Sequence, residues 1–252
     1  MYSKVDSGIE QTGIMTVNNI KDREMKTIET KKKARIAGGL IILGMITGLL
    51  SVSPDVDSFE YLTQAAAEAN KVIFAAIFQF VLALIYIGIA LLFYPALAAV
   101  NKDLAIGFLS FRIIATTLMV VGTVLLLSIL LLSQGHVSAS GYNAETLEIT
   151  GNMLKYTRDY FNHVFMVLVL GTSNVILYYL FFKSKLIPQW MSVGGFTGTV
   201  LSIAASTLLL FQVVDVITTE YLILNAPTAL IELLLGIWLL FKGFNLQNIS
   251  EK

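Results

Sequence analysis

Hydrophobic residues in this chain form six long runs that are separated by polar segments. A helix needs about 20 mainly apolar residues to cross the hydrocarbon core of a bilayer, because it rises about 1.5 Å per residue. The runs are long enough, and we expect spans at approximately 34–52, 72–94, 104–132, 160–182, 190–211 and 221–241. The pattern predicts an all-α, polytopic membrane protein built as a six-helix transmembrane bundle.

Polar segments flank these runs and divide the chain into three parts. Residues 1–33 carry alternating charges and no sustained apolar face, which predicts a disordered or partly helical cytoplasmic tail. Residues 34–244 form the membrane domain, and residues 245–252 form a C-terminal cytoplasmic tail. Two helix-forming stretches, 58–70 and 144–158, are expected to extend the second and fourth spans beyond the membrane.

Basic residues are distributed unevenly between the two sets of connecting segments. With the N-terminus inside, only Lys71, Lys155 and Arg158 fall in outer segments, and the other basic residues near span ends fall on the cytoplasmic side. Lysine and arginine close to span ends resist translocation across the membrane. The distribution therefore predicts a multi-pass protein of the cell membrane with both termini in the cytoplasm.

Composition supports a membrane protein and narrows the chemistry. The chain is 56% hydrophobic and 13% charged, whereas soluble domains have about 25% charged residues. The formal net charge is zero, so no nucleic-acid partner is indicated, and membrane lipids are the expected surroundings. The chain has no cysteine and two histidines, which excludes disulfides and thiolate sites and gives no basis for a metal or cofactor.

Three polar residues lie at one depth inside the predicted bundle. Arg112 is ten residues past Lys102, Glu232 is ten before Lys242, and Asn174 is nine before Lys183. Each is therefore about 13–15 Å from the cytoplasmic end of its helix. Tyr86 on the second span reaches a similar depth.

Two helices also carry polar stripes through this layer. On the sixth span, Asn225 and Thr228 share a helical face with Glu232. On the third span, Thr116 follows Arg112 by one turn. A charge inside a membrane is costly and faces protein, water or a partner. The candidate intramembrane polar site consists of Tyr86, Arg112, Thr116, Asn174, Asn225, Thr228 and Glu232.

We expect Arg112 and Glu232 to meet in the bundle interior, since opposite charges offset part of each other's desolvation. One interpretation is a polar cavity for a small molecule, ion or proton, which makes the chain a binding or transport protein. The alternative is a structural or regulatory membrane protein whose Arg–Glu pair only fixes helix packing. A third and less favoured class is an intramembrane enzyme acting on lipid, because no nucleophile–base set is visible and no catalytic residue is assigned.

Other polar and small residues have simpler interpretations. His163, about one turn into the fourth span, is a candidate titrating residue on the outer side, although an interfacial histidine that reaches water is the favoured reading. Gly44 and Gly48, and also Gly194 and Gly198, form small-residue stripes. Such stripes let helices approach closely, and we favour packing within one chain over a homo-oligomer.

Three segments resemble a known family of bacterial membrane proteins. They are KKKARIAGGLIILGMITGLLS, KSKLIPQWMSVGGFTGTVLSI and APTALIELLLGIWLLFKGFN. They are similar to the domain-of-unknown-function family 4386 over approximately residues 32–245, with Gln189 where an arginine is usual. The resemblance implies an integral membrane protein of bacterial origin and supplies no activity or catalytic residues.

Overall fold

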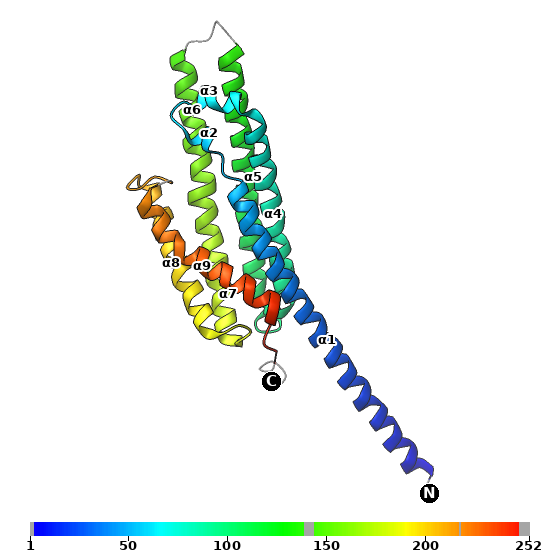
Figure 1. Cartoon of the computed structure of the whole chain (residues 1–252). Coiled ribbons are helices and arrows are strands. Elements are labelled where there is room, and N and C mark those ends of the chain that lie inside the picture. Colours follow the sequence, from blue (N-terminus) through cyan, green and yellow to red (C-terminus); the bar gives the residue numbers. More distant parts are fainter. Residues whose placement is uncertain (1–2, 139–143, 217, 247–252) are drawn as a thin grey trace.

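The computed structural model describes residues 3–138, 144–216 and 218–246, and this part of the chain consists of helices joined by short connections, without strands (Figure 1). Six helical segments are long and apolar enough to cross a membrane, as predicted. They correspond to the six hydrophobic runs of the sequence. The six are 27–50, 69–98, 102–137, 145–184, 189–210 and 219–242.

Six long helices pack in sequence order and close into a ring. The first three are α1 (Ser3–Leu50), α4 (Ala69–Ala98) and α5 (Lys102–Ser138), and each contacts the next. The ring continues through α7 (Met166–Ser184), α8 (Gln189–Leu210) and α9 (Thr219–Lys242), and α9 returns to α1. The interior of the ring is therefore lined by helices that are distant in sequence.

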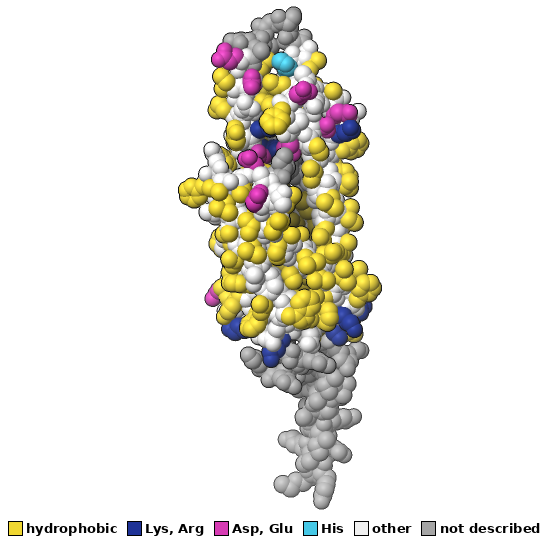
Figure 2. Space-filling view, turned by 60° about the vertical axis from the view of Figure 1, so that its left-hand side comes forward, with side chains coloured by type: hydrophobic (Ala, Val, Ile, Leu, Met, Phe, Trp, Pro, Cys, Tyr) yellow, Lys and Arg dark blue, Asp and Glu magenta, His cyan; other side chains and the backbone are white. Residues whose placement is uncertain are grey.

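Opposite charges gather at opposite ends of the bundle. Lys and Arg lie at the end where the N-terminal part of α1 projects, and Asp and Glu lie toward the other end, with hydrophobic side chains between them (Figure 2). We call these the basic end and the acidic end. The basic end contains Lys102 at the start of α5, Lys183 near the end of α7 and Lys242 at the end of α9.

The N-terminal helix is longer than its predicted span. Helix α1 begins at Ser3 and so continues through most of the polar segment before residue 34. The N-terminal part of α1 and the end of α9 lie at the same end of the bundle (Figure 1). The cytoplasmic assignment of residues 1–33 and 245–252 stays a prediction, and residues 1–2 and 247–252 lie outside the described part.

The stretch 58–70 was expected to extend the second span as one helix, and this expectation was wrong. The region instead contains two short helices, α2 (Pro54–Asp57) and α3 (Tyr61–Ala67). Helix α3 is separated from α4 at Glu68, whose φ of −108° and ψ of 32° are not helical. Helix α3 packs mainly on α5. Tyr61 and Ala65 are buried in a cluster with residues of α4 and α5, so tertiary packing outweighs helix propensity here.

The stretch 144–158 does extend the fourth span, as predicted. Helix α6 (Ala144–Asp159) continues into α7 through a π-helical segment, η1 (Tyr160–Phe165). A π-helix adds a residue to one turn and shifts the faces of the helix that follows. Asn162 in this segment is buried against Gly122 of α5, where an added Cβ would lie 1.8 Å from its Oδ1.

Candidate functional site

A cavity of about 300 Å³ lies inside the helical ring, between α1, α4, α5, α7 and α9. Its polar lining consists of side chains from four of these helices. Tyr86 comes from α4, Arg112 from α5, Asn174 and Tyr178 from α7, and Glu232 from α9. Four of these residues, Tyr86, Arg112, Asn174 and Glu232, were predicted to lie at a similar depth, and they line one cavity.

Arg112 is held by contacts from three helices. Its side chain is 6% exposed, and its Nη2 donates a hydrogen bond of 2.7 Å to Asn174 Oδ1. Its Cζ lies 5.7 Å from the ring centroid of Tyr86 and 5.3 Å from that of Phe108, which are cation–π distances. Its Nε is buried and has no hydrogen-bond partner among the described residues. The guanidinium is thus fixed in place beside the cavity that Arg112 lines.

Glu232 lies on the α9 side of the same cavity. The expected ion pair with Arg112 does not form: no nitrogen–oxygen contact of 4.0 Å or less joins the two among the described residues. No described side chain or backbone group donates a hydrogen bond to Glu232 either. The prediction of a direct contact was wrong because the cavity separates α5 from α9, and both side chains face that space.

Three predicted site residues do not line the cavity. Thr116 donates to the carbonyl of Arg112 at 3.0 Å, and Asn225 donates to the carbonyl of Tyr221 at 2.9 Å, so both are bound to their own helices. Thr228 lies 2.8 Å from the hydroxyl of Ser202 on α8. Helix α9 crosses the bundle, so successive residues of its polar stripe have different neighbours. Thr228 contacts α8, Glu232 lines the cavity, and Gly236 contacts α1.

Sequence reasoning did not select Tyr178, which is buried and lines the cavity. It follows Asn174 by four residues on α7, so it shares that helical face, and this spacing was a usable signal. His163 lies away from this cavity, in η1, with its ring 6.3 Å from that of Tyr221. Its assignment as a titrating residue stays a prediction.

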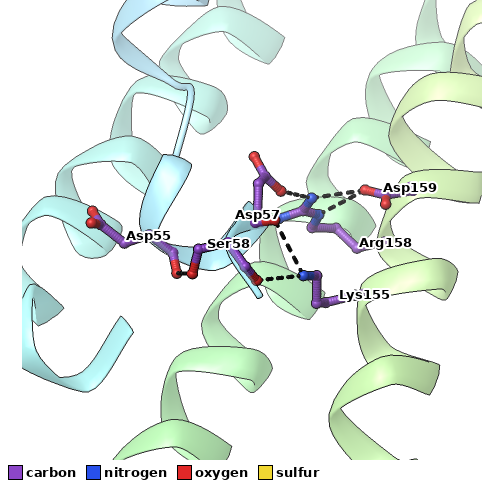
Figure 3. A network of polar contacts seen from close by, with 6 residues as sticks. All are labelled: Asp55, Asp57, Ser58, Lys155, Arg158 and Asp159. Atoms are coloured by element: carbon purple, nitrogen blue, oxygen red, sulfur yellow. Dashed lines mark hydrogen bonds and ion pairs between the residues drawn. The ribbon is translucent and has the colours of Figure 1, made fainter. Parts of the chain in front are cut away.

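A separate polar network joins the short helices to α6 at the acidic end (Figure 3). Arg158 Nη2 donates to Asp57 Oδ1 and, at 2.8 Å, to Asp159 Oδ1. Lys155 Nζ donates to the Ser58 carbonyl at 3.0 Å and lies 4.4 Å from the ring centroid of Tyr61. These contacts stabilise the loop between α1 and α4 on α6, and no sequence pattern indicated them.

The small-residue stripe of α8 packs within the chain. A Cβ added to Gly198 would lie 2.9 Å from the backbone nitrogen of Thr228 on α9, and one added to Gly194 would lie 2.7 Å from Ile231. Gly44 and Gly48 face Leu82 and the cavity instead. Whether copies of the chain associate stays a prediction.

The fold and the apolar surface define the class of protein: a multi-pass membrane protein, built as a bundle of membrane-spanning helices around an internal cavity. The chain belongs to the family described as a domain of unknown function (DUF4386), whose profile matches residues 36–243. This confirms the family resemblance of the three segments quoted above. Comparisons with curated proteins and with solved structures find no match.

Proposed function

We propose that this protein binds a small polar ligand, or the polar part of a larger one, in the cavity between Arg112 and Glu232, either as a receptor or as a step in transport. The observation that carries the proposal is that two oppositely charged side chains face one cavity without contacting each other. A pair that only fixed helix packing would gain most from direct contact, because contact offsets desolvation.

The chemistry of the lining supports a ligand with two kinds of polar group. Arg112 lines the cavity and offers a charged guanidinium to an anionic or acceptor group, and that guanidinium is preoriented by Asn174 and two aromatic rings. Glu232 offers an acceptor to a cationic or donor group. We also propose that the basic end is cytoplasmic, as the distribution of lysine and arginine near the span ends favours.

The proposal is tested by native mass spectrometry of the full chain released from its own membranes. We expect the wild type to retain a bound molecule of discrete mass, and Glu232→Gln to lose most of it. Thr123→Val is the control, because Thr123 is buried and polar but bonds Gln79 at 3.0 Å, away from the cavity. Each variant is first shown to be folded by its elution volume and melting curve.

Two results contradict the proposal. One is a wild-type protein that carries no discrete bound molecule. The other is a folded Glu232→Gln variant that retains the molecule as well as the wild type and Thr123→Val do.

A further inference from the structure

The route into the cavity indicates what kind of molecule can reach it. Toward the basic end, Phe93, Phe181 and Phe244 pack against one another below the cavity, with ring centroids 5.4–5.7 Å apart. All three are at most 1% exposed. These rings fill the bundle interior on that side of the cavity, and their buried side chains have almost no contact with solvent.

A second packed layer lies toward the acidic end. Leu82, Ala83 and Met119 are buried together, and Val120 and Met166 pack against them. Met119 lies seven residues past Arg112, and Met166 lies eight before Asn174, which places this layer beyond the polar lining. On the α4, α5 and α7 side, apolar packing therefore lies between the polar lining and the acidic end.

The exposed part of the cavity lining lies between α1 and α9. Leu49 lines the cavity and is 78% exposed, and Ala229 lines it from α9 and is also exposed. Nearer the basic end the two helices are in close contact, since a Cβ on Gly38 would lie 2.5 Å from the backbone nitrogen of Leu240. From that contact α9 slants away from α1 (Figure 1). The exposure of the lining residues Leu49 and Ala229 indicates that the cavity opens between these two helices.

The α1 side of this lateral mouth is apolar. Gly44, Met45, Gly48 and Leu49 form its α1 side, and none carries a polar side chain. The absence of side chains at the two glycines gives room for an alkyl chain beside α1. A polar ligand arriving from lipid must carry an apolar part through this mouth while its polar part reaches the charged residues.

We propose that the occupant is a membrane lipid with a zwitterionic phosphate–ammonium headgroup, which enters between α1 and α9. The phosphate accepts hydrogen bonds from Arg112, the ammonium donates to Glu232, and the acyl chains leave past Gly44 and Gly48. Both otherwise unpaired charges are then satisfied by one molecule. This inference rests on the proposed function, because it names the ligand class of the same cavity.

The test uses purified full chain, dioleoyl phosphatidylethanolamine as the probe and native mass spectrometry as the readout. We expect one tightly retained lipid on the wild type, and at least about tenfold less on Arg112→Gln, because the charge-assisted hydrogen bonds to the phosphate are lost. Phosphatidylglycerol lacks the ammonium group. We expect the wild type to retain less phosphatidylglycerol than phosphatidylethanolamine, and Glu232→Gln to retain the two lipids equally.

The mouth itself is tested by a matched pair of substitutions on α1. An added Cβ at Gly48 would lie 3.8 Å from Leu82, and one at Gly39 would lie 3.8 Å from Leu240, so both positions have similar room. Only Gly48 lines the cavity. We expect Gly48→Leu to reduce lipid retention about as much as Arg112→Gln does, and Gly39→Leu to leave it unchanged.

The lipid proposal and the proposed function fail in different ways. In one outcome, the wild type binds soluble phosphoethanolamine with an affinity that neither added lipid nor Gly48→Leu changes. That result overturns the lateral route, while a polar site in the cavity stands. If Arg112→Gln, Glu232→Gln and the wild type retain lipid equally and none binds phosphoethanolamine, both are overturned.

Discussion

Arg112 and Glu232 differ in the contacts that their side chains make with the surrounding protein. The guanidinium donates a hydrogen bond to Asn174 and has two aromatic rings at cation–π distance. The carboxylate has no such contact within the described part of the chain. Burying a charge without a hydrogen bond or ion pair costs free energy. Glu232 is half-buried beside the cavity, where a bound cationic or donor group would offset the desolvation of its carboxylate.

This asymmetry predicts the sign of a stability change. We expect Glu232→Gln to raise the midpoint of thermal unfolding in detergent without added lipid, by the equivalent of roughly 1–4 kcal/mol, because a neutral amide is cheaper to bury than an uncompensated carboxylate. Circular dichroism during heating measures it. Asn174→Leu is the contrasting variant, and we expect a lower midpoint because Arg112 loses its hydrogen bond.

A direct Arg–Glu lock predicts the opposite result. Removing one partner of a buried ion pair strands the other charge and costs about 3–5 kcal/mol. A clear fall in the melting temperature of Glu232→Gln would therefore favour the structural role and contradict the cavity interpretation.

Depth from the helix ends was sufficient to select Tyr86, Arg112, Asn174 and Glu232, since rise per residue is fixed in an α-helix. It could not exclude Thr116, because a threonine hydroxyl can bond the carbonyl one turn before it and leave the site. Whether the two charges touch also lay beyond the sequence. That distance depends on how far apart the ring holds α5 and α9.

At the scale of elements, one close contact holds α1 against α9. An alanine Cβ at Gly38 would lie 2.5 Å from the nitrogen of Leu240 and 2.7 Å from the oxygen of Gly236, both backbone atoms that cannot move aside. At the next residue, Gly39, the same Cβ would lie 3.8 Å from the end of a leucine side chain. Two adjacent glycines therefore differ sharply in what they tolerate.

We expect Gly38→Ala to destabilise the bundle by about 1–3 kcal/mol, because the two helices must separate, and Gly39→Ala to leave stability unchanged or slightly higher. Both variants are compared by thermal unfolding in detergent. Equal melting temperatures for Gly38→Ala and the wild type would contradict the close packing of α1 on α9.

The helical segments were predictable wherever hydrophobicity alone decides. Six apolar runs became six membrane-spanning segments because backbone groups in hydrocarbon must bond within their own helix. The region between the first two runs was not predictable in this way. Its break at Glu68 accompanies the packing of α3 on α5, and its attachment to α6 depends on Arg158, which lies 101 residues after Asp57 in the chain.

At the scale of the whole molecule, the separation of basic and acidic ends predicts how the protein sits in the membrane (Figure 2). The chain contains no cysteine, so single cysteines can be introduced without removing others. In intact cells we expect a membrane-impermeant maleimide to label Asp215→Cys and to label Lys102→Cys only after permeabilisation. The reverse pattern would contradict the cytoplasmic assignment of both termini.

The sequence by itself determined the class of protein, the six spans and the depth of the charged residues, because hydrophobicity, rise per residue and charge near span ends are local properties. Only the tertiary structure decided that Arg112 and Glu232 face a common cavity without touching. It also decided that aromatic and aliphatic layers pack on either side of the polar lining, and that the mouth of the cavity lies between α1 and α9. Those features arise from contacts between the first and last helices, and periodicity along one helix does not specify its distant partners.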